Sequence, residues 1–322
     1  MRIVVTGSIA FDYIMSFPGR FKDHILPDKI HMLSVSFLVD SMRKERGGCA
    51  PNIAYSLALL GERPAVMGTV GQDFSDYRAW LERQGVDTSL IREIPELFTA
   101  SFFVNTDQDN NQIASFYTGA MARARDLSFH DLGVSDDDLV IISPNDPAAM
   151  TQYAAECKAL GIPYIYDPSQ QIIRLAPDEL VESADGARIL IVNDYELEMF
   201  KNKTGLTDEG VRQLPEALIV TRGESGSTIW AEGRRVDIPA VRPKNLCEPT
   251  GVGDAYRAGI VKGVIRGYSW ETIGRIASLA ATYVLEEHGT QNHRYTCPQF
   301  AGRYEEVFGD TAELEDLLSG TE

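Results

Sequence analysis

Cysteine is scarce in this chain, and hydrophobic runs of membrane-spanning length are absent. The four cysteines, at positions 49, 157, 247 and 297, form no C-x-x-C pair and are too widely spaced for a disulfide framework. They indicate reduced thiols. No apolar run approaches the roughly 18 residues that a membrane helix needs, and the first residues lack the pattern of a signal peptide. We therefore expect a cytoplasmic protein without a membrane partner.

Basic residues are also few compared with acidic ones. Lysine and arginine number 30 against 47 aspartates and glutamates, so the formal net charge is −17. Nucleic-acid affinity comes mostly from basic residues that neutralise phosphates, and so DNA and RNA are not expected partners. Any phosphate group that this protein handles must be met locally, by backbone amides, a metal ion or single arginines.

Two common nucleotide-binding signatures are missing. The chain has no G-x-x-x-x-G-K-[S/T] segment, which excludes a Walker A loop. It has G-V-G at 251–253, but Tyr256 stands where a dinucleotide-binding G-x-G-x-x-G needs its third glycine. An NAD-dependent oxidoreductase is therefore disfavoured.

The 322 residues do contain a regular alternation of β-branched runs with amphipathic stretches. Parallel strands joined by helix-length crossovers give this pattern, so we expect an α/β fold with helices on both faces of a mostly parallel sheet. The predicted strands are Ile3–Thr6, Ala65–Val70, Leu139–Ser143, Tyr164–Asp167, Ile189–Asn193 and Leu218–Thr221, and the predicted helices are Pro51–Leu60, Asp73–Gln84, Ala148–Leu160, Asp194–Lys203 and one from about Gly251 to Arg266.

Two stretches, residues 13–44 and 97–120, break this rhythm with period-2 patterns. We expect them to form a small β lid on a core made of residues 1–12, 45–96 and 121–322. In the first stretch, the alternating residues of 33–39 give an expected strand one apolar face, from Leu33, Val35, Phe37 and Val39. We expect that a homodimer formed through the lid covers this face. The alternative is that the face packs on the lid's own second hairpin.

The second stretch reads as a β-hairpin with the polar turn D-Q-D-N-N at 107–111. If the hairpin is symmetric about Asp109, Phe102 lies directly opposite Phe116. The two rings then either pack as a small lid core or clamp a flat ligand ring.

The segment P-T-G-V-G-D-A-Y-R-A-G at 249–259 carries the strongest chemical signal. Its glycines allow a tight turn into a helix, so the amides of Gly251, Val252 and Gly253 would face an anion at the helix N-terminus. Asp254, in the first turn, would lie beside that anion and could accept a hydroxyl proton during phosphoryl transfer. The plainer alternative is that Asp254 only caps the helix.

Three further segments each allow a purely structural interpretation and a functional one. G-G-C-A-P-N-I-A at 47–54 places two glycines before a helix, which is either a turn or a close approach to a bound group. N-D-Y-E at 193–196 follows a strand and is at least a capping box. T-R-G-E-S-G at 221–226 follows another strand with a glycine-rich loop, whose Arg222 is a candidate contact for a polyphosphate.

In this order along the chain, these four motifs resemble those of the ribokinase-like (PfkB-type) carbohydrate and nucleoside kinases. The resemblance implies a ribokinase-like three-layer α/β/α core with a small β-sheet lid, and transfer of the ATP γ-phosphoryl group to a hydroxyl. It implies ATP contacts at Asn193, Glu196, Thr221, Arg222, Gly223 and Gly226, with Mg²⁺ held through water near Glu196. K⁺ is a further candidate cofactor, although Glu248 stands where many members of the family carry aspartate.

A closer resemblance is to the mycobacterial-type bacterial adenosine kinases. It is carried by G-S-I-A-F-D at 7–12, F-P-G-R-F at 17–21, S-V-S-F-L-V-D at 34–40, I-A-S-F-Y at 113–117, N-D-P at 145–147, D-P-S-Q-Q at 167–171 and G-T-Q at 289–291. This likeness assigns Asp12 to the ribose hydroxyls, with Ser8, Gly48 and Asn52 around them. It further implies that Phe102 and Phe116 sandwich the base, that Gln170 or Gln171 contacts its polar edge, and that Asp254 acts on the 5′-hydroxyl of adenosine.

Two alternatives remain open at this point. The first is a kinase of the same family for another nucleoside or for a sugar such as ribose or fructose 6-phosphate. A phosphorylated acceptor would require basic residues near Asp12, Phe102 and Phe116, and those segments supply few. The second is a non-catalytic nucleoside-binding protein, against which the retained Asp254 argues, because a binding protein needs no base.

Overall fold

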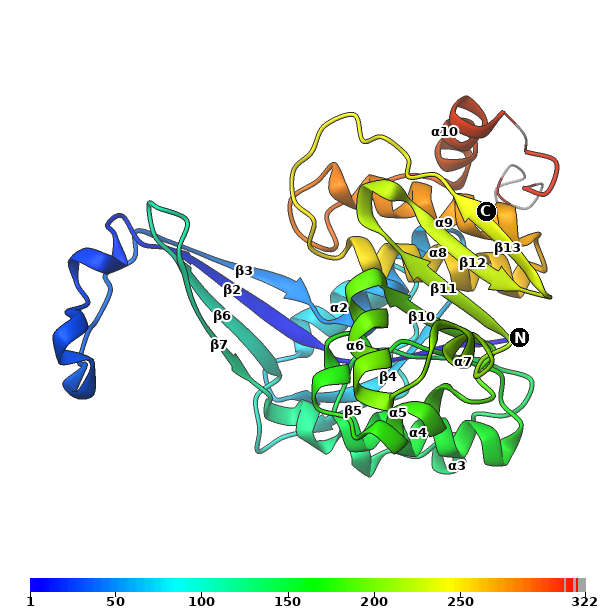
Figure 1. Cartoon of the computed structure of the whole chain (residues 1–322). Coiled ribbons are helices and arrows are strands. Elements are labelled where there is room, and N and C mark those ends of the chain that lie inside the picture. Colours follow the sequence, from blue (N-terminus) through cyan, green and yellow to red (C-terminus); the bar gives the residue numbers. More distant parts are fainter. Residues whose placement is uncertain (310, 315–316, 318–322) are drawn as a thin grey trace.

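A large sheet forms the centre of the computed structural model, which describes residues 1–309, 311–314 and 317. Its nine strands are β1 Ile3–Thr6, β4 Ala65–Gly71, β5 Ile91–Ile94, β8 Leu139–Ile142, β9 Tyr164–Tyr166, β10 Ile189–Asn193, β11 Ala217–Thr221, β12 Ser227–Ala231 and β13 Arg234–Ile238. They follow the order β13-β12-β11-β10-β9-β8-β1-β4-β5 (Figure 1). Neighbours from β11 to β5 are parallel, whereas β12 and β13 form an antiparallel edge. The prediction of a mostly parallel sheet is confirmed.

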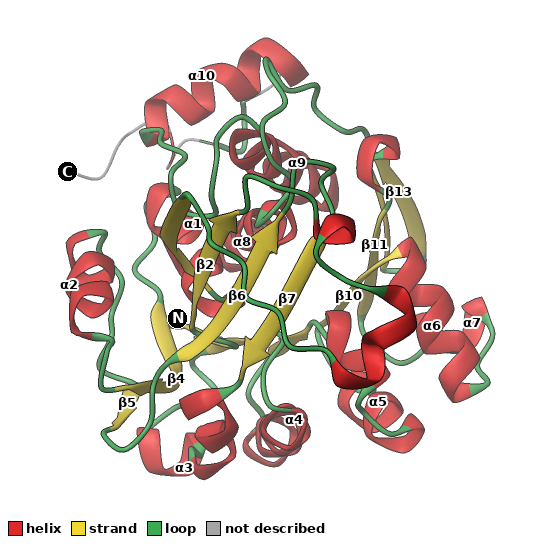
Figure 2. Ribbon diagram, turned by 90° about the vertical axis from the view of Figure 1, so that its left-hand side faces the viewer, coloured by secondary structure: helices red, strands yellow, loops and turns green. Residues whose placement is uncertain are grey.

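Helices cover both faces of this sheet, because alternate residues of its strands are buried on opposite sides. Ile3 and Val5 pack with one group of helices and Val4 with the other. The first group is α1 Cys49–Leu59, α2 Ser75–Arg83, α8 Val252–Arg266 and α9 Trp270–Leu285; the second is α3 Phe129–Leu132, α4 Pro147–Leu160, α5 Pro177–Ala184, α6 Asp194–Thr204 and α7 Asp208–Arg212. Helix α10, Cys297–Phe308, packs on α9 (Figures 1 and 2). The predicted three-layer α/β/α arrangement is confirmed.

A second, smaller sheet projects from one side of the core (Figure 1). It consists of β2 Ala10–Ser16, β3 Ser41–Gly47, β6 Ala100–Thr106 and β7 Gln112–Tyr117, in the order β3-β2-β6-β7. Its register pairs Phe102 with Phe116, as predicted from the symmetry of the hairpin. The same register pairs Asp12 with Phe102 and with Glu45. Because paired residues share a face of a sheet, Glu45, Asp12, Phe102 and Phe116 form one row across it.

The expected strand at residues 33–39 is wrong. These residues form no strand, and β3 begins only at Ser41, which pairs with Ser16 at the end of β2. Alternation indicates an extended segment, but a strand also needs a partner for its backbone hydrogen bonds, and β2 ends before it could supply one. Of the four residues expected on one apolar face, Leu33 is 50% exposed, whereas the ring of Phe37 packs on Phe17 and Phe21.

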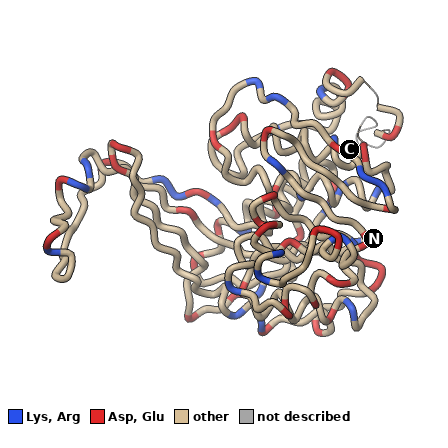
Figure 3. The backbone as a smooth tube through the Cα atoms, in the orientation of Figure 1, with Lys and Arg blue, Asp and Glu red and all other residues tan. Residues whose placement is uncertain are grey.

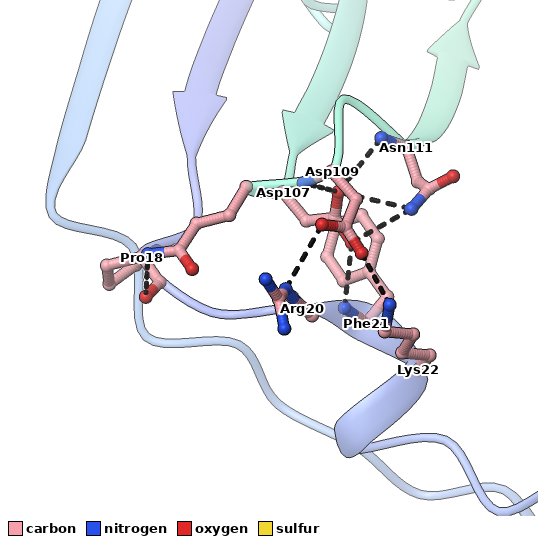
Figure 4. Close-up of polar contacts among 8 residues, drawn as sticks. Pro18, Arg20, Phe21, Lys22, Asp107, Asp109 and Asn111 are labelled. Atoms are coloured by element: carbon pink, nitrogen blue, oxygen red, sulfur yellow. Dashed lines mark hydrogen bonds and ion pairs between the residues drawn. The ribbon is translucent and has the colours of Figure 1, made fainter.

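Residues 17–40, which we call the arm, extend beyond the tip of the small sheet (Figure 1). The β6–β7 turn holds the base of the arm in place, as Figure 4 shows. The Asp107 carboxylate accepts hydrogen bonds from the backbone N–H groups of Phe21, Asp109 and Asn111, each at 2.9 Å. Asp109 forms ion pairs with Arg20 at 3.1 Å and Lys22 at 2.7 Å. The buried Asp107 carboxylate therefore attaches the arm to the β6–β7 turn, whereas the aromatic cluster of Phe17, Phe21 and Phe37 packs within the arm itself.

Candidate active site

A pocket of about 270 Å³ opens where several parallel strands end at the same edge of the large sheet. Ligands of open α/β sheets bind at this edge, beyond the carboxyl ends of the strands. The pocket is lined by Cys49 and Pro144, by Asp167, Ser169 and Gln170 after β9, by Asn193 and Glu196 after β10, by Thr221 at the end of β11, and by Gly251, Gly253, Asp254 and Arg257 around the start of α8. Seven residues of the predicted site thus share one cavity.

The glycine-rich turn enters α8 as the sequence predicts. Gly251 is the N-cap residue with φ of 83°, a conformation that side-chain-bearing residues rarely adopt. Val252 and Gly253 begin the helix, and Asp254 lies in its first turn. The N–H group of Val252 donates to the carbonyl of Pro249 at 3.4 Å. No partner for the N–H group of Gly253 is found among the described residues, so this amide, at the lining of the pocket, is available to an anion.

Asn52 ties the candidate base to helix α1. Its side-chain amide Nδ2 donates a hydrogen bond to Oδ2 of Asp254 at 2.8 Å, and its Oδ1 accepts one from Nε2 of Gln291 at 2.9 Å. Gln291 is buried and also donates to the hydroxyl of Tyr77, while its Oε1 accepts from Nε1 of Trp80 at 3.1 Å. Asp254 is therefore oriented by a network of four side chains: Asn52 from α1, Tyr77 and Trp80 from α2, and Gln291 from the segment after α9.

The surroundings of Asp254 adjust its acidity. Burial in the pocket raises the pKa of Asp254 to about 7, while the hydrogen bond from Asn52 and the charge of Arg257 act in the opposite direction. A carboxylate with a pKa near neutrality is well matched to accepting a proton at physiological pH. The geometry thus supports a base and not only a helix cap.

The double glycine at 47–48 permits two close contacts within the protein. A Cβ atom at Gly48 would lie 2.5 Å from the carbonyl oxygen of Ser8, and one at Gly47 would lie 2.5 Å from Oδ2 of Asp12. The glycines therefore let the start of α1 approach the β1–β2 connection and the Asp12 carboxylate. Ser8 completes this junction, because its Oγ accepts a hydrogen bond from the N–H of Cys49 at 3.1 Å.

Asp12, in strand β2 of the small sheet, has an unusually high pKa for an aspartate. Burial, followed by the negative charges of Glu248 and Glu45, raises the pKa of Asp12 to about 6. Among the described residues no hydrogen-bond donor to its carboxylate is found. An acceptor left without a protein partner beside the two phenylalanines is available to ligand hydroxyls.

The strand ends on the other side of the pocket hold polar side chains in place. Asn193 and Glu196 form the predicted capping box: Asn193 accepts from the N–H of Glu196 at 2.7 Å, and Glu196 accepts from the N–H of Asn193 at 2.8 Å. Glu196 also accepts from Ser169 at 3.1 Å. Gln170 lines the pocket, whereas Gln171 is buried and no hydrogen-bond partner for its Oε1 is found among the described residues. Either glutamine thus has a polar group available to a ligand.

The loop at 221–226 forms the turn between β11 and β12. Thr221 lines the pocket, and Gly223 and Gly226 adopt positive φ values of 53° and 80°. Arg222 points elsewhere: its Nη2 donates to Oγ1 of Thr228 and lies 3.5 Å from Oδ1 of Asp237. The guanidinium of Arg222 is therefore paired at the sheet edge rather than directed into the pocket.

Arg257 and Asp167 are two pocket residues to which the sequence gave no role. They form a buried bidentate ion pair, with Nη2 of Arg257 at 2.6 Å from Oδ1 of Asp167 and Nε bonded to Oδ2. Burial alone would lower the pKa of Arg257, but the Asp167 carboxylate raises it above its ordinary value. Both residues lie within quoted motifs, yet only the fold brings residues 90 positions apart into contact.

The described part of the chain contains no group of three or more His, Cys, Asp or Glu side chains that could hold a metal ion. The carboxylate oxygens of Glu196 already accept hydrogen bonds. This arrangement fits Mg²⁺ carried by phosphates and water, as is usual for that cation, rather than a protein cage. Glu248, the candidate neighbour of a monovalent cation, accepts a hydrogen bond from the N–H of Gly289 at 3.3 Å, and its carboxylate lies 3.8 Å from Nδ1 of His288.

None of the described helices is long and apolar enough to cross a membrane.

Comparison with known proteins agrees with this geometry. Residues 9–297 match the model of the pfkB family of carbohydrate kinases. A nucleoside kinase of Methanothermobacter thermautotrophicus is 31% identical over 294 residues, which cover 90% of this chain and 91% of that protein. Among solved structures, the Burkholderia thailandensis nucleoside kinase in complex with inosine superposes with a TM-score of 0.84 at 37% identity, covering 96% of this chain and 98% of that one.

A third relative widens the comparison. The nucleoside kinase of Methanocaldococcus jannaschii, an archaeal member of the ribokinase family, has a TM-score of 0.84 at 28% identity and covers 95% of this chain and 99% of its own. The family match and the ribokinase-like fold lead to one conclusion, with which the aspartate in the first turn of α8 agrees. The chain belongs to the pfkB family of carbohydrate kinases and is a phosphotransferase that acts on a hydroxyl group.

Proposed function

We propose that this chain transfers the γ-phosphoryl group of ATP to the 5′-hydroxyl of a nucleoside in the cytoplasm, with adenosine as the favoured acceptor. The observation that carries the proposal is the row of Asp12, Phe102 and Phe116 on the small sheet, next to the junction that holds Asn52 and Asp254. A carboxylate for hydroxyls and two rings for a flat base match the two halves of a nucleoside. The relatives named as nucleoside kinases, one of them solved with inosine, favour the same acceptor class.

In this account Asp254 orients the acceptor hydroxyl and takes its proton as the new bond to phosphorus forms. The amides of Gly251, Val252 and Gly253 stabilise negative charge on the transferring oxygens. Because the transition state of phosphoryl transfer is loose, alignment and charge neutralisation supply most of the rate enhancement.

The nucleotide would lie along the strand ends, with Thr221, Gly223 and Gly226 around it and Asn193 and Glu196 near its phosphates. A relative supports this donor side: the Burkholderia thailandensis enzyme has been solved in complex with ADP-inosine. Mg²⁺, when bound, neutralises phosphate charge, and Glu196 would hold it through water. Arg222 could reach the phosphates only after leaving Asp237, and we propose no K⁺ contact beyond the neighbourhood of Glu248.

The charge around Asp12 favours an uncharged acceptor. Glu45 pairs with Asp12 across the strands, and Glu248 is close enough to raise the pKa of Asp12. A sugar phosphate would bring negative charge toward these carboxylates and be repelled. Another nucleoside, such as inosine or cytidine, is the main alternative; a sugar kinase or a non-catalytic nucleoside-binding protein is more remote.

Product analysis tests the proposal. We expect adenosine and ATP to give AMP and ADP in equal amounts, detected by chromatography, with no AMP when ATP is replaced by its β,γ-methylene analogue. 5′-Deoxyadenosine, which lacks the acceptor hydroxyl, is expected to compete with adenosine without being phosphorylated. Phosphorylation at another position, or binding without turnover, would contradict the proposed reaction.

The aromatic pair predicts acceptor selectivity. Phe116 is 50% exposed, which leaves its ring available to a ligand. Replacing Phe102 and Phe116 together by alanine is expected to raise the KM for adenosine about 10- to 100-fold, since stacking on an aromatic ring contributes about 1–3 kcal/mol per base. Activity on ribose should change little. Phe103→Ala, on the opposite face of β6, serves as the control; equal losses on adenosine and ribose would show that the pair is only packing.

The hydrogen bond from Asn52 predicts a shift in pH dependence. That bond favours the ionised form of Asp254, so Asn52→Ala is expected to raise the pKa of Asp254. The acid limb of kcat/KM, near pH 7 in the wild type, should move to higher pH, and activity at low pH should fall more than at pH 9. Asn202→Ala, an exposed site on α6, should leave the profile unchanged; an unshifted limb in Asn52→Ala would contradict the assignment.

We also propose that the protein forms a homodimer through the small sheet and the arm. The apolar arm residues Leu26, Ile30, Met32 and Leu38 are 60% to 87% exposed, and β3 and β7 are free sheet edges. Residues of both charge signs lie along the arm, three of each (Figure 3), so two copies can approach without net repulsion. Light scattering should give twice 35.6 kDa, and Leu38→Asp with Ile30→Asp should give the monomer; a wild-type monomer at all concentrations would overturn the proposal.

A further inference from the structure

Arg257 occupies a position in the pocket that no motif assignment explains. It lies one helical turn after Asp254 on α8 and is only 9% exposed. Of the residues that line the pocket, all of them in the described part of the chain, Arg257 is the one cationic side chain. The remaining charged side chains there are the carboxylates of Asp167, Glu196 and Asp254.

Asp167 fixes the orientation of this guanidinium. Its two oxygens accept from Nε and Nη2 of Arg257, and the Asp167 backbone N–H is itself bonded to the carbonyl of Ile142 at 2.9 Å. A bidentate contact of this kind sets both the position and the plane of an arginine. The carboxylate side chain is 1% exposed, so it has no alternative partner in water.

Nη1 is the part of the guanidinium that Asp167 leaves free. No hydrogen-bond partner for it is found among residues 1–309, 311–314 and 317. A Cβ atom at Gly253 would lie 2.7 Å from Nη1. The nitrogen therefore lies directly beside the glycine turn that lines the pocket, and Gly253 is the residue that makes this approach possible.

We propose that Arg257 is a catalytic residue that donates from Nη1 to the transferring phosphoryl group, and that Asp167 is the positioning residue that aims it. The inference rests on the proposed transfer from ATP. In that step the acceptor oxygen bonds to the γ-phosphorus, the bond to the β,γ-bridging oxygen breaks, its electron pair stays on ADP, and the hydroxyl proton passes to Asp254. Charge builds on the γ-phosphoryl oxygens between the amides of the glycine turn and Nη1.

The charge of the pocket supports this role. A triphosphate must enter beside three carboxylates, and Arg222, the other candidate cation, is paired with Asp237. Burying an arginine–aspartate pair contributes little to stability compared with well-packed apolar residues. A pair that keeps one N–H group open toward the pocket has a functional explanation, because a fixed cation there needs no rearrangement during the reaction.

The rival explanation is that the ion pair only ties α8 to the end of β9. Arg257→Lys separates the two, because lysine keeps the charge but carries it on a single nitrogen, which cannot reproduce the two-nitrogen contact with Asp167 and also place a donor at the position of Nη1. Arg303→Lys is the matched control: Arg303 forms a buried bidentate pair with Glu286, at 2.7 and 2.6 Å, far from the pocket. Asp167→Asn tests the positioning role.

We expect Arg257→Lys to lower kcat about 100-fold, the usual cost of losing one donor to a transition state, with adenosine affinity unchanged. Affinity for ADP with aluminium fluoride, a mimic of the transferring phosphoryl group, should fall by a similar factor while affinity for ADP alone stays constant. Asp167→Asn should follow the same pattern more weakly. Arg303→Lys should leave all three values unchanged, whatever its effect on the Tm.

A wild-type measurement complements the variants and does not depend on their folding. Arginine side-chain ¹⁵N resonances can be assigned by their loss in the two lysine variants, or by the buried environment if Arg257→Lys does not fold. Adding ADP with aluminium fluoride should shift Arg257 but not Arg303, and ADP alone should shift neither. An unshifted Arg257, or a folded Arg257→Lys with wild-type kcat, would overturn the inference.

These outcomes are distinct from failure of the proposed acceptor. If the wild type phosphorylates a sugar instead of nucleosides, the acceptor assignment is wrong, yet the Arg257→Lys loss should appear on that sugar. If nucleosides are phosphorylated and Arg257→Lys is fully active, the acceptor assignment stands and the inference about Arg257 fails.

Discussion

Asp254→Asn is expected to lower kcat for nucleoside phosphorylation about a thousand-fold, within the range that a positioned general base contributes. Asparagine keeps the size of the side chain but cannot accept the hydroxyl proton. The hydrogen-bond chain from Asn52 remains possible after a rotation of one amide, so the site should keep its shape. Binding of adenosine, measured by calorimetry, should stay within about three-fold of the wild-type value.

The stability of Asp254→Asn provides a second check. Burial raises the pKa of Asp254 to about 7, so above that pH the ionised side chain costs stability in the ligand-free protein. Asparagine removes that cost, and the variant should melt at a higher temperature than the wild type at pH 8. Asp76→Asn, an exposed aspartate in the first turn of α2, is the matched control and should change neither kcat nor Tm appreciably. Retention of more than about a tenth of the wild-type kcat in Asp254→Asn would rule out the base.

Asp12→Asn is expected to lower kcat/KM for adenosine about 100-fold, mainly through KM. An ionised carboxylate accepts two hydroxyl hydrogen bonds, whereas the amide offers one acceptor and turns donors toward the ligand. The 2′- and 3′-hydroxyls of the ribose are the predicted partners of Asp12. On 2′,3′-dideoxyadenosine, which lacks both hydroxyls, the kcat/KM values of Asp12→Asn and the wild type should therefore differ little. A loss of equal size on the dideoxy nucleoside would place the role of Asp12 elsewhere.

The same substitution should stabilise the ligand-free protein. Burial and the charges of Glu248 and Glu45 raise the pKa of Asp12 from its ordinary value to about 6. The folded state therefore binds the proton more tightly than the unfolded state, and ionised Asp12 costs stability above pH 6. We expect the unfolding free energy of Asp12→Asn to exceed that of the wild type by on the order of 2 kcal/mol at pH 8. This difference should disappear as the pH falls from 6 to 4. Lower stability of Asp12→Asn at pH 8 would contradict this electrostatic account.

Local patterns predicted the parts of the fold that local chemistry determines. The capping box of Asn193 and Glu196 and the glycine entry into α8 depend on neighbours in sequence, and both are found in the structure. The alternation of strands with helix-length segments along the chain likewise indicated the parallel sheet. The pairing of Phe102 with Phe116 was predictable because one short turn fixes the register of a hairpin.

The features that failed or were missed depend on distant partners. Residues 33–39 alternate like a strand but have no strand to pair with. Arg222 is a reasonable phosphate contact in sequence, but β12 and β13, which were not predicted, bring Thr228 and Asp237 to its guanidinium. Gln291 joins Asn52 across 239 positions, and no local pattern could indicate that contact.

The acidic composition agrees with the site that the structure reveals. The predicted phosphate contacts are backbone amides and one fixed arginine, neither of which requires a basic surface. Glu45 and Glu248 lie close enough to Asp12 to raise its pKa, and at the proposed acceptor site these carboxylates would disfavour a charged acceptor. A formal net charge of −17 is therefore compatible with a phosphotransferase whose acceptor is uncharged.

One measurement tests the central claim most directly: ATP consumption by the wild-type protein, coupled to ADP detection, with a panel of acceptors at equal concentration. The panel contains adenosine, inosine, cytidine, ribose and fructose 6-phosphate. The account predicts that kcat/KM for at least one nucleoside, with adenosine foremost, exceeds that for either sugar by 100-fold or more. Preference for ribose or fructose 6-phosphate over every nucleoside would contradict it.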